Sequence, residues 1–264
     1  MKPDVILNHV ALTYLARCPR MYDLYCLRAV RRMATGQQEI GIYIHKFIEE
    51  NVKGKTAAQF LSENPSEQKE VVATVAMLNN KFDSSTVLRI NDVPVVEWQF
   101  GFKIAETERA NYHLFGTIDL ALVENGYCSV YDHKTTSIAT KDVVLRRYAN
   151  DIQIPLYCYV LSRFTDVPIT GGYYHIIQTS KMPPVTFMSP LVKPNDHAVE
   201  TVLENAIATV ERILAGRAAP PNGMLNGSCG TCQFSALCSV TDTEHFNQIV
   251  ESMEKEVYDP RKWR

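Results

Sequence analysis

Apolar residues in the first 90 positions recur every three to four residues, which is the spacing of one face of an α-helix. Asn8 precedes such a stretch and is expected to cap its helix, and Pro19 suits the first turn of a second helix that runs to about residue 27. Two more helices are predicted, over residues 40–52 and 66–82. The first third of the chain is therefore predicted to be helical.

The pattern then changes to stretches rich in β-branched and aromatic residues, separated by polar turns. These stretches cover residues 93–104, 113–123 and 127–133, and the last two are joined by Asn125-Gly126. Because Asn-Gly favours a tight hairpin turn, we expect a three-stranded meander.

Helical periodicity returns over residues 141–164, where Pro155 is expected to break or kink the helix. Strands are predicted over 171–179 and 185–188, and a long helix over about 196–215. The order of elements favours an α/β or α+β fold with a central mixed sheet flanked by helices. We predict one domain over residues 1–264, made of three parts: a helical part (about 1–90), a core (about 91–215) and a cysteine-bearing segment (about 216–264).

The overall composition excludes some classes of protein. A chain of 264 residues with 46% hydrophobic residues can bury a large core, and a net charge of -2 lacks the basic excess typical of nucleic-acid binding, so any such surface must be local. The sequence has neither a secretory signal nor a long uncharged apolar run, which predicts a cytoplasmic protein without membrane contact. The phosphate-binding loop of nucleotide-driven motors and the G-x-S-x-G turn of serine hydrolases are both absent.

Two acidic residues and a lysine gather at the predicted hairpin. Asp119 and Asp132 lie on its two strands, and Lys134 shares a strand face with Asp132 because side chains alternate with period 2. Carboxylates that bind Mg²⁺ or Mn²⁺ beside a lysine suit phosphodiester hydrolysis, whereas an isolated Asp-x-Lys is more often a surface ion pair. These residues alone leave both interpretations open.

The order of motifs makes the pattern more specific. Gly116-Thr117-Ile118-Asp119 precedes Asp132-His133-Lys134, and Gln153 and Tyr157 follow with Q-x-x-x-Y spacing. This order resembles the PD-(D/E)xK nuclease superfamily, and within it the RecB-type nuclease domain and the Cas4-like exonucleases. The resemblance implies a restriction-endonuclease-like core, with Asp119, Asp132 and Lys134 catalytic and with Gln153 and Tyr157 supporting the site.

Three further residues are candidates for the same site. Gly41 to His45 matches the G-x-x-x-H helix of those relatives, which implies that His45 is a metal ligand. His133 is included among the possible metal ligands with Asp119 and Asp132. Glu97 either reaches the same edge of the sheet or faces solvent. An imidazole ligand is more typical of Mn²⁺ than of Mg²⁺, so activity with manganese is expected.

The cysteines form a second candidate site. Seven cysteines, an odd number, do not indicate disulfides in a reducing compartment, and Cys229, Cys232 and Cys238 follow C-x2-C-x5-C spacing. Cys18 is the candidate for a fourth ligand, and four thiolates suit zinc or an iron–sulfur cluster equally well. The segment Cys18-Pro19-Arg20-Met21-Tyr22 resembles the one that opens the iron–sulfur members of this nuclease group, which implies a [4Fe–4S] cluster.

Together, these patterns and the resemblance predict a metal-dependent DNA exonuclease. Its expected substrates are single-stranded DNA or the ends of linear duplexes, in recombination, repair or CRISPR-like DNA processing. The alternatives are a structure-specific endonuclease, or a non-catalytic DNA-binding or recombination partner that retains the fold and the cluster. A protein partner or a homo-oligomer is possible in either case.

Overall fold

The computed structural model describes most of the chain, as two compact units. The described residues are 2–30, 36–138, 140–179, 183–217, 219, 227–240, 242–253 and 255. Unit 1 contains residues 1–33, 100–116 and 200–264, and unit 2 contains residues 34–99 and 117–199.

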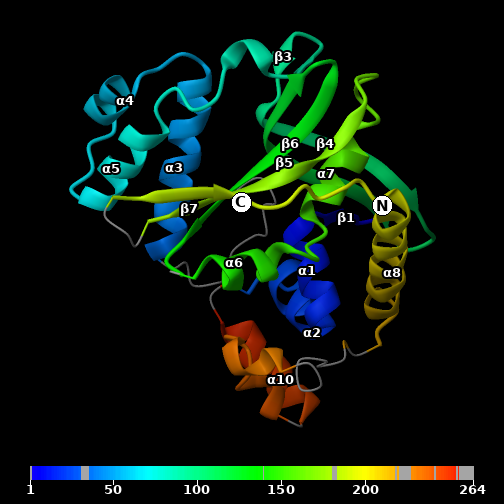
Figure 1. The fold of residues 1–264 in the computed structure, drawn as a ribbon. Helices are drawn as coiled ribbons and strands as arrows, with labels where there is room; N and C mark the ends of the chain where they lie inside the picture. Colours follow the sequence, from blue (N-terminus) through cyan, green and yellow to red (C-terminus); the bar gives the residue numbers. More distant parts are fainter. Residues whose placement is uncertain are drawn as a thin grey trace. The chain divides into compact units, whose positions relative to one another are not determined.

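Unit 2 contains most of a mixed sheet (Figure 1). Its strands are the start of β4 (Val96–Glu106), the end of β5 (Asn111–Glu124), β6 (Tyr127–Thr136), β7 (Ile169–Gln178) and β8 (Val185–Met188). Two short strands, β2 (Arg89–Ile90) and β3 (Val93–Pro94), pair with each other in a separate sheet. β5 and β6 form an antiparallel hairpin, β7 pairs with β6 in parallel, and β8 pairs with β7 antiparallel. The hairpin turn has positive φ at Asn125 (52°) and Gly126 (80°), so the expected Asn-Gly turn is confirmed.

Helices cover both faces of this sheet in unit 2. They are α3 (Gly36–Val52), α4 (Ala57–Glu63), α5 (Lys69–Leu78), α6 (Lys141–Tyr148), α7 (Gln153–Leu161) and the start of α8 (Asp196–Leu214). One face packs against α3, α4 and α5, grouped together in Figure 1, in a buried core that includes Phe47, Val75 and Ile177. The other face packs against α7, which lies so close to β7 that a side chain at Gly172 would overlap Ile154. The predicted fold class, a mixed sheet between helices, is therefore confirmed.

Unit 1 is built mainly from the two ends of the chain. Its elements are β1 (Asp4–Leu7), α1 (His9–Arg17), α2 (Pro19–Tyr22), the π-helical turn η1 (Asp23–Leu27), the short 3₁₀ turns η3 (Ser228–Thr231) and η4 (Leu237–Ser239), and α10 (Thr243–Ser252). β1 pairs in parallel with the first residues of β5. The guanidinium groups of Arg20 and Arg28 both lie over the ring of Phe246 in α10. Cation–π contacts thus link the first helices to the last one.

Several predicted boundaries were wrong. The break in the 141–164 helix falls between Tyr148 and Gln153, and Pro155 lies in the first turn of α7, where its missing N–H is one that the helix leaves unpaired in any case. The helix predicted over 66–82 is shorter, because Asn80 has a positive φ of 57° just beyond the end of α5. β1 and α4 were missed. The segment from 216 to 230 lies outside the described residues, apart from 216, 217, 219 and 227–230.

The cap of α1 has the predicted form. Asn8 caps α1, with its Oδ1 accepting a hydrogen bond from the Ala11 N–H at 2.8 Å, as expected. Among the described residues, no helix is both long enough and apolar enough to cross a bilayer.

Candidate active site

A histidine on α3 is held against the hairpin strands by a close helix–strand approach. Gly41 faces β6, where an added Cβ would lie only 3.2 Å from Thr135 Oγ1, so glycine allows α3 to lie close to the strand. His45 follows one turn later, and its Nε2 lies 2.8 Å from the backbone oxygen of His133. Because a carbonyl oxygen only accepts, Nε2 carries the proton and Nδ1 is left to face the carboxylates.

Two carboxylates lie at Nδ1 of His45. Glu97 Oε1 is 3.0 Å from this nitrogen and Asp119 Oδ2 is 3.5 Å from it. Asp119 also accepts a hydrogen bond from the His133 N–H at 2.7 Å, which fixes its carboxylate. Glu97 has a φ of 45°, a left-handed conformation that is costly for a residue with a side chain. The strained backbone aims Glu97 at His45, so Glu97 faces the site and not solvent.

His45, Glu97 and Asp119 form a set of donors that we call the cation group. Each offers one ligand atom, and these atoms lie within 4.8 Å of one another. Burial lowers the pKa of His45, but the Asp119 and Glu97 carboxylates outweigh it and raise this pKa to about 9, while burial raises the pKa of Asp119. Without a cation, a proton on His45 thus offsets the negative charge of the two carboxylates, as a bound cation would. Two carboxylates and an imidazole fit a divalent cation of the Mg²⁺ or Mn²⁺ class.

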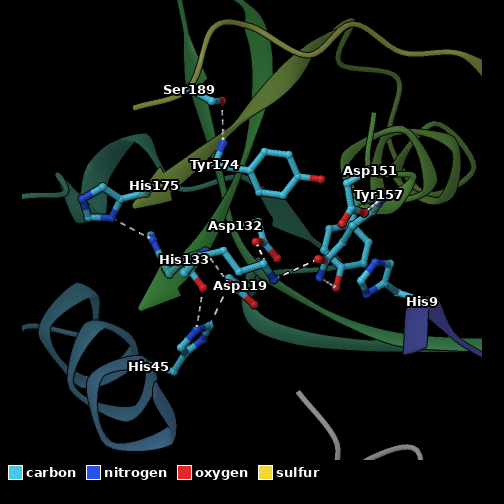
Figure 2. A network of polar contacts seen from close by, with 12 residues as sticks. His9, His45, Asp119, Asp132, His133, Asp151, Tyr157, Tyr174, His175 and Ser189 are labelled. Atoms are coloured by element: carbon cyan, nitrogen blue, oxygen red, sulfur yellow. Dashed lines mark hydrogen bonds and ion pairs between the residues drawn. The ribbon is translucent and has the colours of Figure 1, made fainter. Parts of the chain in front are cut away.

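Asp132, labelled in Figure 2, continues the site on β6, and Lys134 follows it on the same strand. Lys134 Nζ lies 2.7 Å from Asp132 Oδ2 and donates to Gln153 Oε1 at 2.8 Å, and the Gln153 amide donates in turn to the Tyr157 hydroxyl at 2.8 Å. Burial raises the pKa of Asp132 to about 6, although Lys134 opposes this. Burial lowers the pKa of Lys134, but Asp132 and Asp119 outweigh it, so the ammonium stays charged.

Asp132 has one further property that points to a ligand. Its side chain is fully buried, and Oδ1 has no hydrogen-bond partner among the residues that the structure describes. A buried carboxylate oxygen without a partner is costly unless a cation or a water satisfies it. Figure 2 shows Asp119 between His45 and Asp132, so Asp132 extends the cation group.

His133 is the one candidate whose side chain the structure does not bring to this group. Its backbone contacts Asp119 and His45, whereas its imidazole Nδ1 lies 3.0 Å from Nδ1 of His175 on β7, beside the ring of Phe82. Burial lowers the pKa of both imidazoles, that of His175 to about 3, so both rings are neutral. His175 was missed because no motif includes it, although the parallel register of β6 and β7 pairs it with His133.

The comparisons with known proteins agree with this geometry. The family model for the PD-(D/E)XK nuclease superfamily matches residues 7–239, which is most of the chain. The chain belongs to the PD-(D/E)XK nuclease superfamily. The predicted family and its restriction-endonuclease-like fold are thus confirmed, and the family implies a nucleic-acid substrate and a divalent metal.

One solved structure is similar enough to support the fold of the nuclease. A candidate exonuclease from Eubacterium rectale is similar with a TM-score of 0.55 and 13% identity, over 90% of each chain, which supports the fold alone. A second structure, that of SSO0001, has a TM-score of 0.43 and 16% identity over 92% of this chain and 89% of that one, which is too low to support an argument. No curated protein matches the nuclease sequence.

The nuclease has a second candidate site in unit 1. Cys18, Cys229, Cys232 and Cys238 line one pocket with Arg20 and Phe234. We call these four residues the cysteine group. Burial raises the pKa of Cys232 and of Cys238, and the neighbouring sulfur atoms add to this. Four thiols around one pocket suit a metal or cluster that would stabilise their thiolate forms.

Proposed function

We propose that this nuclease is a metal-dependent DNA exonuclease whose catalytic cation is held by His45, Glu97, Asp119 and Asp132. The cation group with its ligand atoms within 4.8 Å of one another, next to the unpartnered oxygen of Asp132, is the observation that supports this most. A divalent cation supplies an activated water and stabilises charge on the phosphate.

The residues around the cation site have separate roles in this proposal. Lys134, charged and in contact with Asp132, orients the attacking water and stabilises charge that develops on the scissile phosphate. Gln153 holds the ammonium of Lys134, and Tyr157 holds the Gln153 amide. Gln153 and Tyr157 are therefore positioning residues. Because an imidazole is among the proposed ligands, we expect Mn²⁺ to support activity at least as well as Mg²⁺.

The cysteine group is proposed to bind a [4Fe–4S] cluster. Four thiolates fit zinc and an iron–sulfur cluster equally well on ligand chemistry. The choice of the cluster rests on the similarity of the Cys18–Tyr22 segment to the one in iron–sulfur nucleases.

The substrate and pathway are proposed from the family and from the neighbouring fold. The similar Eubacterium rectale protein is named as a candidate exonuclease. We propose single-stranded DNA or ends of linear duplexes as substrates, in recombination, repair or CRISPR-like DNA processing. A cytoplasmic location, a single domain over residues 1–264 and a protein partner or homo-oligomer stay predictions.

Digestion of labelled DNA tests this function. Linear and covalently closed circular DNA, single- and double-stranded, are incubated with the protein and Mg²⁺ or Mn²⁺, with Asp132→Asn and Lys134→Ala as inactive variants. Asp142→Asn is the matched control, because Asp142 is an exposed acid on α6 outside the site. Mononucleotide release from linear DNA only is the expected result. Cutting of circles would indicate an endonuclease, and equal inertness of the wild type and the variants would refute the proposal of an enzyme.

A further inference from the structure

Tyr174 is a buried tyrosine that no motif includes. It lies on β7 at the register position of Asp132 on β6, so both side chains are on the same face of the sheet. Tyr174 is fully buried, and its hydroxyl has no hydrogen-bond partner within the described part of the chain. Buried tyrosine hydroxyls usually have a partner, so an unsatisfied one beside a proposed metal ligand needs an explanation.

The backbone and ring of Tyr174 are fixed by their neighbours. Its N–H donates to Ser189 Oγ at 3.0 Å and its carbonyl accepts from the Ser189 N–H at 3.0 Å. Its ring stacks on the ring of Tyr148, with centroids 4.9 Å apart. Gly172, two residues earlier on the same face, lets α7 lie against β7. The hydroxyl is therefore held in one place by packing.

The surroundings of the hydroxyl are polar and negatively charged. Asp151 and Asp132 are the two charges that act on it, and burial raises its pKa, so Tyr174 stays protonated and can donate. The backbone N–H of Ile154 faces the hydroxyl oxygen and lowers its pKa, but the proton of the hydroxyl has no acceptor within the described part of the chain. In Figure 2 the ring lies next to Asp132, and the hydroxyl points to the side where Asp151 and Tyr157 lie.

We propose that Tyr174 is a positioning residue for the cation site, whose hydroxyl holds the Asp132 carboxylate through one bridging water. Two polar atoms without partners, Tyr174 Oη and Asp132 Oδ1, can satisfy such a water together. This contact fixes the carboxylate in the orientation that binds the cation, as outer residues do at other metal sites. The inference rests on the proposed function, because it assumes that Asp132 is a metal ligand.

Manganese binding to Tyr174→Phe tests the proposal without nuclease activity. Phenylalanine keeps the stack on Tyr148 and removes only the hydroxyl. We expect a dissociation constant for Mn²⁺ about 10-fold weaker than that of the wild type by calorimetry, with an unchanged or higher melting temperature. Activity of this variant should recover in part at high Mn²⁺. Tyr173→Phe is the matched control, because Tyr173 lies on the opposite face of the same strand and should not change the affinity.

A double-mutant cycle with Asp132→Asn tests whether the Tyr174 hydroxyl acts on Mn²⁺ binding through Asp132 or through a general effect on the fold. In the Asp132→Asn background, removal of the Tyr174 hydroxyl should change Mn²⁺ affinity by less than 2-fold. Wild-type affinity in Tyr174→Phe, or an equal loss in Tyr173→Phe, would overturn the inference and leave the proposed function intact. Absence of Mn²⁺ binding by the wild-type protein would overturn both.

Discussion

The cation group and the cysteine group differ in how their ligands are held. His45, Glu97 and Asp119 lie on a long helix and two long strands, and hydrogen bonds fix His45 and Asp119 to the backbone of β6. Cys18 precedes a four-residue helix, and Cys229, Cys232 and Cys238 lie in or beside short 3₁₀ turns. The fold itself arranges the first group, so the metal proposed there would serve chemistry. In the second group the proposed cluster would take the place of regular secondary structure and would serve stability.

The largest expected effect is a loss of catalysis at the cation site with little change in the stability of the fold. We predict that Asp132→Asn lowers nuclease activity on the order of 10³-fold or more, because a ligand is lost and Lys134 loses its ion partner. Its melting temperature should change little, because relief of an unfavourably buried carboxylate, whose pKa burial raises to about 6, offsets the ion partner that Lys134 loses. Activity assays and thermal unfolding measure the two effects. A large loss of stability would contradict the view that the fold arranges this group.

For the cysteine group, the second prediction is the opposite: a substitution there should mainly lower stability. Cys232→Ala should remove the visible absorbance of the purified protein and destabilise it by about 3 kcal/mol or more, because thiolate–cluster bonds link both ends of the chain. Absorbance spectra, iron content and denaturant unfolding measure this. Cys26→Ala is the control, because Cys26 does not line the pocket. An unchanged spectrum and melting temperature in Cys232→Ala would refute the proposed cluster.

The same comparison explains how far sequence reasoning extends. The hairpin could be predicted because Asn125-Gly126 and strand alternation are local signals, and they place Asp132 and Lys134 on one face. The left-handed backbone at Glu97 could not be predicted, because tertiary contacts impose it and the residue type disfavours it. For that reason the sequence left the direction of Glu97 open.

Contacts between distant strands were the other limit of sequence reasoning. The ring of His133 contacts His175, and Tyr174 lies near Asp132, because β7 pairs with β6 in parallel. Parallel pairing joins segments about 40 residues apart in the sequence and has no turn signal of its own. The order of motifs therefore identified the charged residues of the site, whereas Tyr174 and His175 could be found only from the register of β6 and β7.

A third prediction concerns the pH dependence of stability, which should arise in unit 2 near the active site. The pKa of His175 is lowered from its usual 6.5 to about 3 in the folded protein, so between these values the unfolded chain binds a proton that the folded chain does not. Stability is thus fully present above pH 6.5 and falls as pH decreases, by about 1.4 kcal/mol per pH unit for this group. His133, whose pKa is also lowered, acts in the same direction.

His175→Gln tests the source of this effect. Glutamine does not titrate and can still form a hydrogen bond with Nδ1 of His133. Urea unfolding at pH 7 and pH 5 should show a loss of about 2 kcal/mol more in the wild type than in His175→Gln. If both proteins lost the same stability between these pH values, His175 would be ruled out as the source of the acid sensitivity.

The smallest expected effect lies in unit 1, in the helix that precedes Cys18. Asn8→Ala removes the oxygen that accepts the Ala11 N–H at 2.8 Å, which should cost about 1 kcal/mol of stability. Asn8→Asp keeps an acceptor and should cost less. Because an ordered α1 leads directly into Cys18, the loss in Asn8→Ala should be larger after the cluster is removed by chelation, when no cluster remains to hold that end of the helix. Equal losses with and without the cluster, measured by denaturant unfolding, would show that the cysteine group does not support the helices around it.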